Sequence, residues 1–188
     1  MDALLPPLVA AFLAEWGDRT QLLAMLLAVR FGRARPVLAG IAIGAFANNL
    51  LSAFAGRMLA EFINFRAITL LMALALLFAG MGALIPQKPP KLDGGGSGGA
   101  FLASLFAFAV LAFGDKTQFL TATLAARADS LWLPAIGATV GVLLATVPAV
   151  LLADRIASVL PLRTIRLVFG VIFLLLGAMA AISALHLV

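Results

Sequence analysis

Cysteine is absent from the sequence, histidine occurs once, and charged side chains are scarce. Without cysteine the chain forms neither a disulfide nor a thiolate metal site. The single histidine, His186, lies near the C-terminus, far from other candidate ligands, which disfavours zinc and copper centres. Charged residues make up 11% of the chain, against about 25% in soluble domains. A water-soluble fold is therefore improbable.

Apolar residues take the place of the missing charge. Hydrophobic residues make up 64% of the chain, and the mean hydropathy is +1.15. A transmembrane helix needs about 20 apolar residues, so six such helices with short loops use nearly all of the 188 residues. The lipid bilayer is the expected partner. The net charge of +5 is better explained by cytoplasmic loops than by nucleic acid, and we expect no nucleic-acid partner.

Six apolar runs predict an all-α integral membrane protein with six transmembrane helices. The predicted spans are residues 4–29, 37–60, 67–86, 101–126, 132–154 and 164–185. Loops one, three and five hold eight basic residues, namely Arg30, Arg33, Arg35, Lys88, Lys91, Arg155, Arg163 and Arg166, against Arg57, Arg66 and Arg127 on the other side. The positive-inside rule then places these three loops in the cytoplasm and both termini outside the inner membrane.

The two halves of the chain align at a shift of 97 residues. Glu15-Trp-Gly-Asp-Arg-Thr-Gln21 lies over Ala112-Phe-Gly-Asp-Lys-Thr-Gln118, and the pair Gly40/Gly44 lies over Gly137/Gly141. With three spans in each half, the second half must enter the membrane inverted, as in many secondary transporters. We expect repeats at 1–86 and 101–188, joined by a Gly-rich linker at 87–100. The glycine pairs predict close helix packing.

Five ionisable residues fall inside predicted spans: Glu15, Asp18, Arg19, Asp115 and Lys116. Each charge at the bilayer centre costs at least about 2.5–3.5 kcal/mol, so these groups must be paired, hydrated or bound to a ligand. A purely structural set of buried ion pairs is the alternative, although such pairs are weak evidence for stability.

A continuous helix would place several oxygen ligands on one face. At about 100° per residue, Glu15, Asp18 and Arg19 share one arc, Gln21 lies nearby and Thr20 points elsewhere. The second motif offers Asp115, Lys116 and Gln118. Carboxylate and amide oxygens suit Mg²⁺, Ca²⁺ and Mn²⁺. The predicted metal ligands are Glu15, Asp18, Gln21, Asp115 and Gln118, with Arg19 and Lys116 balancing the charge.

Two asparagines lie in the middle of the second predicted span. Asn48 and Asn49 have Ala145 and Thr146 at the equivalent positions of the second half. They could add a carbonyl ligand to the site or form hydrogen bonds between helices, and the sequence leaves both roles open.

The paired motif Glu-x-Gly-Asp-[Arg/Lys]-Thr resembles that of uncharacterised protein family 0016, the transmembrane protein 165 type. The resemblance extends over nearly the whole chain. It implies a cation/proton exchanger for Mn²⁺ or Ca²⁺ with six spans in a 3+3 repeat. It also implies roles at the cation site for Thr20 and Thr117, beside the acids and amides already named. One position departs from the family: Ala112 replaces the Glu of the second motif, which leaves three carboxylates instead of four.

These observations predict a secondary transporter that exports Mn²⁺ or Ca²⁺ in exchange for protons. The metal ion is the transported substrate, and no resident cofactor is expected. One rival is an exporter of another small solute on the same fold, and another is a membrane scaffold that transports nothing. An intramembrane enzyme is disfavoured because no plausible nucleophile–base pair occurs in the spans.

Overall fold

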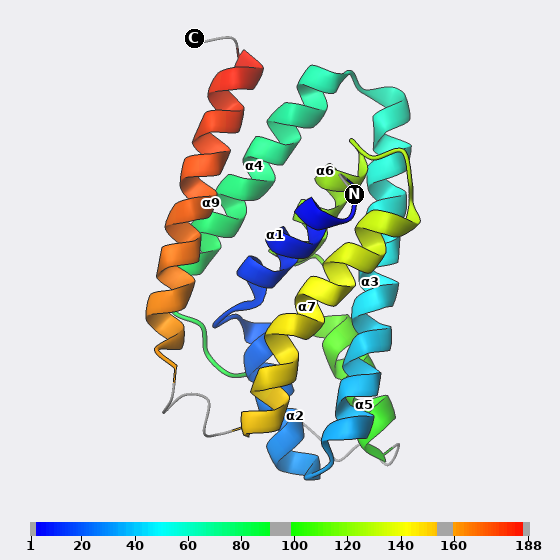
Figure 1. Ribbon diagram of the computed structural model, residues 1–188, viewed down its shortest axis with the longest axis vertical. Coiled ribbons are helices and arrows are strands. Elements are labelled where there is room, and N and C mark those ends of the chain that lie inside the picture. Colours follow the sequence, from blue (N-terminus) through cyan, green and yellow to red (C-terminus); the bar gives the residue numbers. More distant parts are fainter. Residues whose placement is uncertain (1–2, 91–98, 154–159, 186–188) are drawn as a thin grey trace.

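The computed structural model describes residues 3–90, 99–153 and 160–185, and the regular elements in these ranges are all helices. Much of the predicted linker, with Lys91, lies outside the described residues, as do Arg155 and His186. The described helices are α1 (Leu5–Glu15), α2 (Arg19–Phe31), α3 (Ala34–Phe62), α4 (Phe65–Leu84), α5 (Gly99–Leu111), α6 (Lys116–Ala125), α7 (Trp132–Leu152) and α9 (Leu162–Leu185) (Figure 1).

The described chain has four to five candidate membrane spans. Helices α3, α4, α7 and α9 are each long and apolar enough to cross a bilayer. Helices α5 and α6 qualify together as one span, bent by 74°. Helices α1 and α2 have only 11 and 13 residues. The all-α membrane fold is therefore confirmed as a multi-pass protein.

The expectation that residues 4–29 and 101–126 each form one continuous helix was wrong. Each run is broken at a Gly-Asp pair. Gly17 and Gly114 adopt φ values of 68° and 73°. A positive φ cannot continue a right-handed helix and is accessible mainly to glycine. The following aspartates, Asp18 and Asp115, are extended and precede the first residues of α2 and α6.

The helices pack in three main pairs around these breaks. Helix α4 lies beside α9 along much of its length, α1 packs on α7, and α3 packs on α5 (Figure 1). Helix α3 also contacts α6 and α7. The two broken runs contact each other through α1 with α6 and through α2 with α5. The largest core cluster joins buried side chains of α1, α2, α3, α5 and α7.

The glycine pairs have the predicted role in close packing. A methyl group at Gly40 would lie 2.9 Å from the backbone nitrogen of Leu105 in α5. A methyl group at Gly141 would lie 2.9 Å from the backbone nitrogen of Phe12 in α1. Only glycine allows the backbones to approach this closely. The pairs thus hold α3 on α5 and α7 on α1, beside the broken segments.

Candidate cation site at two broken helices

The two breaks are held open by the same hydrogen bond. The amide Oε1 of Gln21 accepts from the backbone N–H of Gly17 at 2.8 Å. The Oε1 of Gln118 accepts from the backbone N–H of Gly114 at 2.7 Å. A broken helix leaves backbone donors unpaired, and each glutamine satisfies one of them from the first turn of the next helix.

Each glutamine also reaches across to another helix. The Nε2 of Gln21 donates to the carbonyl of Ala145 in α7 at 2.8 Å. The Nε2 of Gln118 donates to the carbonyl of Asn48 in α3 at 3.2 Å. Gln21 and Gln118 therefore act as braces in this structure, and their role as ligands stays a prediction. In both motifs the glutamine follows the glycine by four residues, and this spacing is the sequence feature from which the brace could have been predicted.

Glu15 ends α1 in a buried position with two hydroxyl donors. Its carboxylate accepts from the Oγ1 of Thr20 and, at 2.8 Å, from the Oγ1 of Thr117. The residue is 2% exposed. The expectation that Thr20 points away from Glu15 was wrong, because the break at Gly17 resets the direction of the chain between them. The two threonines enclose the carboxylate from both halves of the chain.

A cavity of about 10 Å³ adjoins Glu15 and has mixed polar and apolar walls. Its lining includes Asn48, Asn49, Ala112 and Thr117. This volume holds about one water-sized sphere. Ala112 therefore shares a compartment with Glu15, as the alignment of the two motifs predicted.

Asp18 and Lys116 form an ion pair between the two motifs. The Nζ of Lys116 donates to Oδ1 of Asp18, and both side chains are 5% exposed. Removal of either partner would leave an uncompensated buried charge, which is strongly unfavourable. Lys116 thus neutralises Asp18 in this structure, and its role in balancing the charge of a cation site stays a prediction.

Asp115 lies on a larger cavity next to this pair. The cavity has a volume of about 310 Å³, and its walls include Asp18, Arg19, Asp115 and Lys116. Arg19 is exposed, and its Nε donates to Oε1 of Gln87 at 2.8 Å. No described cation forms an ion pair with Asp115. Gln87 was missed at the sequence level because it lies after the third span, where nothing in the pattern sets it apart.

In place of the predicted single chamber, the acids of the two motifs line two separate cavities in this structure. Asp18 and Asp115 border the larger cavity, whereas Glu15 borders the small one. Within the described ranges, no three acidic or histidine side chains are grouped closely enough to hold a metal ion together. Cation binding by all three acids would therefore require the carboxylates to move closer.

The two asparagines connect helices. Asn48 donates to the carbonyl of Ala109 in α5 at 3.0 Å, and Asn49 donates to the hydroxyl of Thr139 in α7 at 3.2 Å. Of the two roles that the sequence left open, the structure confirms the hydrogen bond between helices.

Comparisons with known proteins connect this site to a family. The family model described as divalent cation/proton antiporter GDT1 matches the chain over residues 3–91 and again over residues 100–187. A protein of Vibrio cholerae serotype O1 (strain ATCC 39541 / Classical Ogawa 395 / O395) is described as "Putative manganese exporter". It is 36% identical over 182 residues, which cover 96% of this chain and 91% of that protein. No solved structure matches the chain. The chain belongs to the divalent cation/proton antiporter family GDT1.

Proposed function

We propose that this protein exports Mn²⁺ or Ca²⁺ from the cytoplasm in exchange for protons. The observation that carries the proposal is the position of Asp18 and Asp115, which come from two broken helices and border one cavity inside an apolar bundle. Aspartate oxygens are ligands that both ions accept. Manganese is the favoured substrate because the similar Vibrio protein is described as a manganese exporter.

The architecture that we propose is a pair of inverted three-helix repeats at 1–86 and 101–188, joined by the linker at 87–100. Hydrogen bonds support it: the pairs Gln21 to Ala145 and Gln118 to Asn48 correspond at the 97-residue shift. Packing supports it as well, since Gly44 meets the backbone of Leu105 while Gly141 meets that of Leu8. The two separate matches of one family model, over 3–91 and 100–187, agree with this division.

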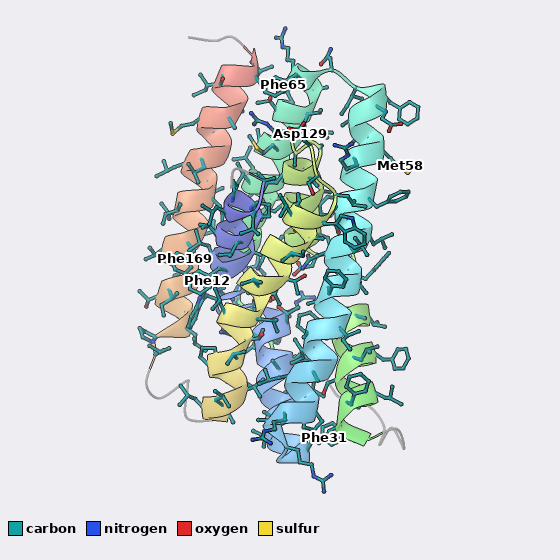
Figure 2. The ribbon with its side chains drawn as sticks, turned by 45° about the vertical axis from the view of Figure 1, so that its right-hand side comes forward. Phe12, Phe31, Met58, Phe65, Asp129 and Phe169 are labelled. Atoms are coloured by element: carbon teal, nitrogen blue, oxygen red, sulfur yellow. The ribbon has the colours of Figure 1, made fainter. Side chains whose placement is uncertain are left out.

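Six crossings follow if α1 with α2 forms one broken span and α5 with α6 forms another. The bundle then has loops one, three and five at one end and loops two and four at the other. Figure 2 agrees with this arrangement: Phe31, before loop one, lies at one end, whereas Phe65 and Asp129, beside loops two and four, lie at the other. We propose that the protein lies in the inner membrane. By the positive-inside rule, the first end then faces the cytoplasm and both termini lie outside.

Exchange follows from competition for the same oxygens. A divalent ion that enters the larger cavity meets Asp18 and Asp115, while Arg19 and Lys116 limit the negative charge of the empty site. Binding of the ion favours the ionised carboxylates, and binding of protons removes the charge that holds the ion. Glu15 would join the ligand set when the two compartments meet. Thr20 and Thr117 hold its carboxylate in a fixed direction.

Purified protein in proteoliposomes tests this proposal. With protons more concentrated on one side, Mn²⁺ should accumulate against its gradient on that side, and the lumenal pH should change in step. Mg²⁺, Ca²⁺ and a neutral solute serve as competitors. Uptake without any response to the pH gradient would contradict exchange. Transport of a non-metal solute, with no effect of Mn²⁺, would support the rival exporter, and a protein that transports none of these would be a scaffold.

A further inference from the structure

The two equivalent ion pairs of the site are not both formed. At the 97-residue shift, Asp18 corresponds to Asp115 and Arg19 corresponds to Lys116. Lys116 pairs with Asp18. The equivalent pair, Arg19 with Asp115, is not formed, and Arg19 instead donates to Gln87. Gln87 corresponds to Ala184, which has no side-chain acceptor, so Lys116 lacks an equivalent alternative partner.

Helix packing shows the same one-sidedness. Helix α4 packs on α6, where the ring centroids of Phe78 and Phe119 are 5.8 Å apart. The equivalent residues are Leu175 in α9 and Leu22 in α2, but α9 and α2 are not packed together, and Leu175 is 61% exposed. Helix α9 also packs on α1, whereas the equivalent helices α4 and α5 do not pack together. The 310 Å³ cavity lies between α4 and α5, with Phe78 and Leu111 in its walls.

A third difference lies at the ends of α4 and α9. Arg66, at the start of α4, donates to the carbonyl of Ala184 at the end of α9 at 2.7 Å. The equivalent Arg163, at the start of α9, is exposed and makes no hydrogen bond with another described residue. The hydrogen bond between Arg66 and Ala184 thus joins α4 and α9 at the end near loop two, and no equivalent bond between described residues joins them at the end near Gln87.

We propose that Lys116 and Arg19 alternate as the counter-cations of the two aspartates. In the structure described here Lys116 neutralises Asp18. In the opposite state Arg19 leaves Gln87 and pairs with Asp115, Lys116 leaves Asp18, and α9 packs on α2 through Leu175 and Leu22. This inference deepens the proposed transport function and rests on the proposed inverted repeat.

Electrostatics explains why such an exchange would control transport. An aspartate without a positive partner is unfavourable in a low-dielectric interior. In each state one aspartate is paired and the other is available to the substrate cation. As the positive side chains change places, the substrate cation passes from the aspartate that becomes paired to the aspartate that becomes free. Arg19 and Lys116 are thus positioning residues that couple cation occupancy to the side on which the site is open.

Chemical cross-linking tests the exchange without any transport measurement. The chain has no cysteine, so two cysteine pairs can be introduced into an otherwise thiol-free protein. Phe78→Cys with Phe119→Cys reports the structure described here, and Leu22→Cys with Leu175→Cys reports the opposite state. Each pair is treated in native membranes with a short bifunctional thiol reagent, and the ratio of the second cross-link to the first is measured.

Single charge changes should move this ratio in opposite directions. Arg19→Gln removes the counter-cation of the opposite state and should lower the ratio about fivefold or more, the lower end of typical coupling between conformational states. Gln87→Ala frees Arg19, and Lys116→Gln removes the present pair, so both should raise the ratio by a similar factor. Arg33→Gln is the matched control, because Arg33 is exposed at loop one, away from the cavity.

Arg19 is exposed, so its substitution leaves the fold intact even if Lys116→Gln does not. A ratio that stays unchanged or rises in Arg19→Gln overturns the proposal. So does a Leu22/Leu175 pair that never cross-links in any variant. Proteoliposome transport of Mn²⁺ is measured separately. A protein that shows the predicted ratios but moves no Mn²⁺ would contradict the proposed substrate and keep the exchange of ion pairs.

Discussion

Gln21 and Gln118 make the same two hydrogen bonds in opposite halves of the bundle. Each accepts from the glycine N–H at its own helix break and donates to a backbone carbonyl on a long helix of the other half. Gln21 is fully buried, whereas Gln118 is half-buried. The breaks that carry Asp18 and Asp115 are therefore held by side chains of the motif itself, and the predictions below begin with this brace.

Removal of a brace should destabilise the bundle. Gln21→Ala leaves the Gly17 N–H and the Ala145 carbonyl without partners, and a buried unpaired polar group costs about 1–3 kcal/mol. Gln118→Ala should cost less, because water reaches a half-buried site. Melting temperatures of the two detergent-purified variants and of the unmodified protein give the order. A smaller loss for Gln21→Ala than for Gln118→Ala would contradict the brace.

The aspartates should be indispensable for transport. Asp115→Asn should keep the fold, whereas Asp18→Asn leaves Lys116 buried without its partner and should also lose stability. Asp18→Asn and Asp115→Asn keep the size of each side chain and remove the charge that would hold a divalent ion. We expect each to lower Mn²⁺ transport at least about 100-fold, since a carboxylate ligand is worth several kcal/mol in a low-dielectric site. Membrane content and gel-filtration profile check folding. Asp129→Asn, in an exposed loop, should transport normally. Normal transport by both site variants would exclude this cavity as the pathway.

Ala112 offers a gain-of-function test. It shares the small compartment of Glu15, so Ala112→Glu would add a fourth carboxylate and bring the site with its bound divalent ion closer to neutrality. Mn²⁺ affinity and the pH dependence of exchange should both increase. The compartment holds only about 10 Å³, so a stability loss of about 1–3 kcal/mol from overpacking should accompany the gain.

The matched control for Ala112→Glu is Ala112→Gln, which has the same bulk without the charge. Calorimetric Mn²⁺ titrations at two pH values compare both variants with the unmodified protein. Equal affinities of the Glu and Gln variants would show that this position does not sense the ion.

The close approach of α7 to α1 should not tolerate a side chain at Gly141. A methyl group there would press on the backbone of Leu8 and Phe12, and such overpacking costs about 1–3 kcal/mol. Gly82→Ala is the control, because a methyl group at Gly82 meets nothing within 4 Å. That control should be neutral or stabilising by up to about 1 kcal/mol from helix propensity. Thermal unfolding compares the two, and equal melting temperatures would refute the packing role of Gly141.

The proposed topology can be read from single cysteines. Lys88→Cys should react with a membrane-impermeant thiol reagent only after the cells are opened, because the positive-inside rule places loop three in the cytoplasm. Arg127→Cys, in loop four, should react in intact cells. The absence of native cysteine gives a blank background. Labelling in the reverse order would invert the proposed orientation.

The sequence alone determined the membrane class, the paired motifs and the glycine contacts. These follow from local features: apolar runs mark helices that lipid can surround, and small residues permit close backbone approach wherever their helices cross. The same chemistry singled out Glu15, Asp18 and Asp115, because a charge in an apolar run needs a partner. The direction of the Thr20 side chain was predicted wrongly, because the prediction assumed one continuous helix. A glycine with positive φ lies between Glu15 and Thr20 and changes the direction of the chain after it.

Only the tertiary structure decided which equivalent contacts are formed. The two motifs offer Lys116 to Asp18 and Arg19 to Asp115 at equivalent positions, and among the described residues only Arg19 has a second partner, Gln87. The packing of α4 on α6 accompanies the first pair, and the 310 Å³ cavity lies where the equivalent packing would close the bundle. A nearly symmetric sequence cannot select one of two equivalent arrangements by local preference, because the selection depends on the summed packing of helices that are far apart in the chain.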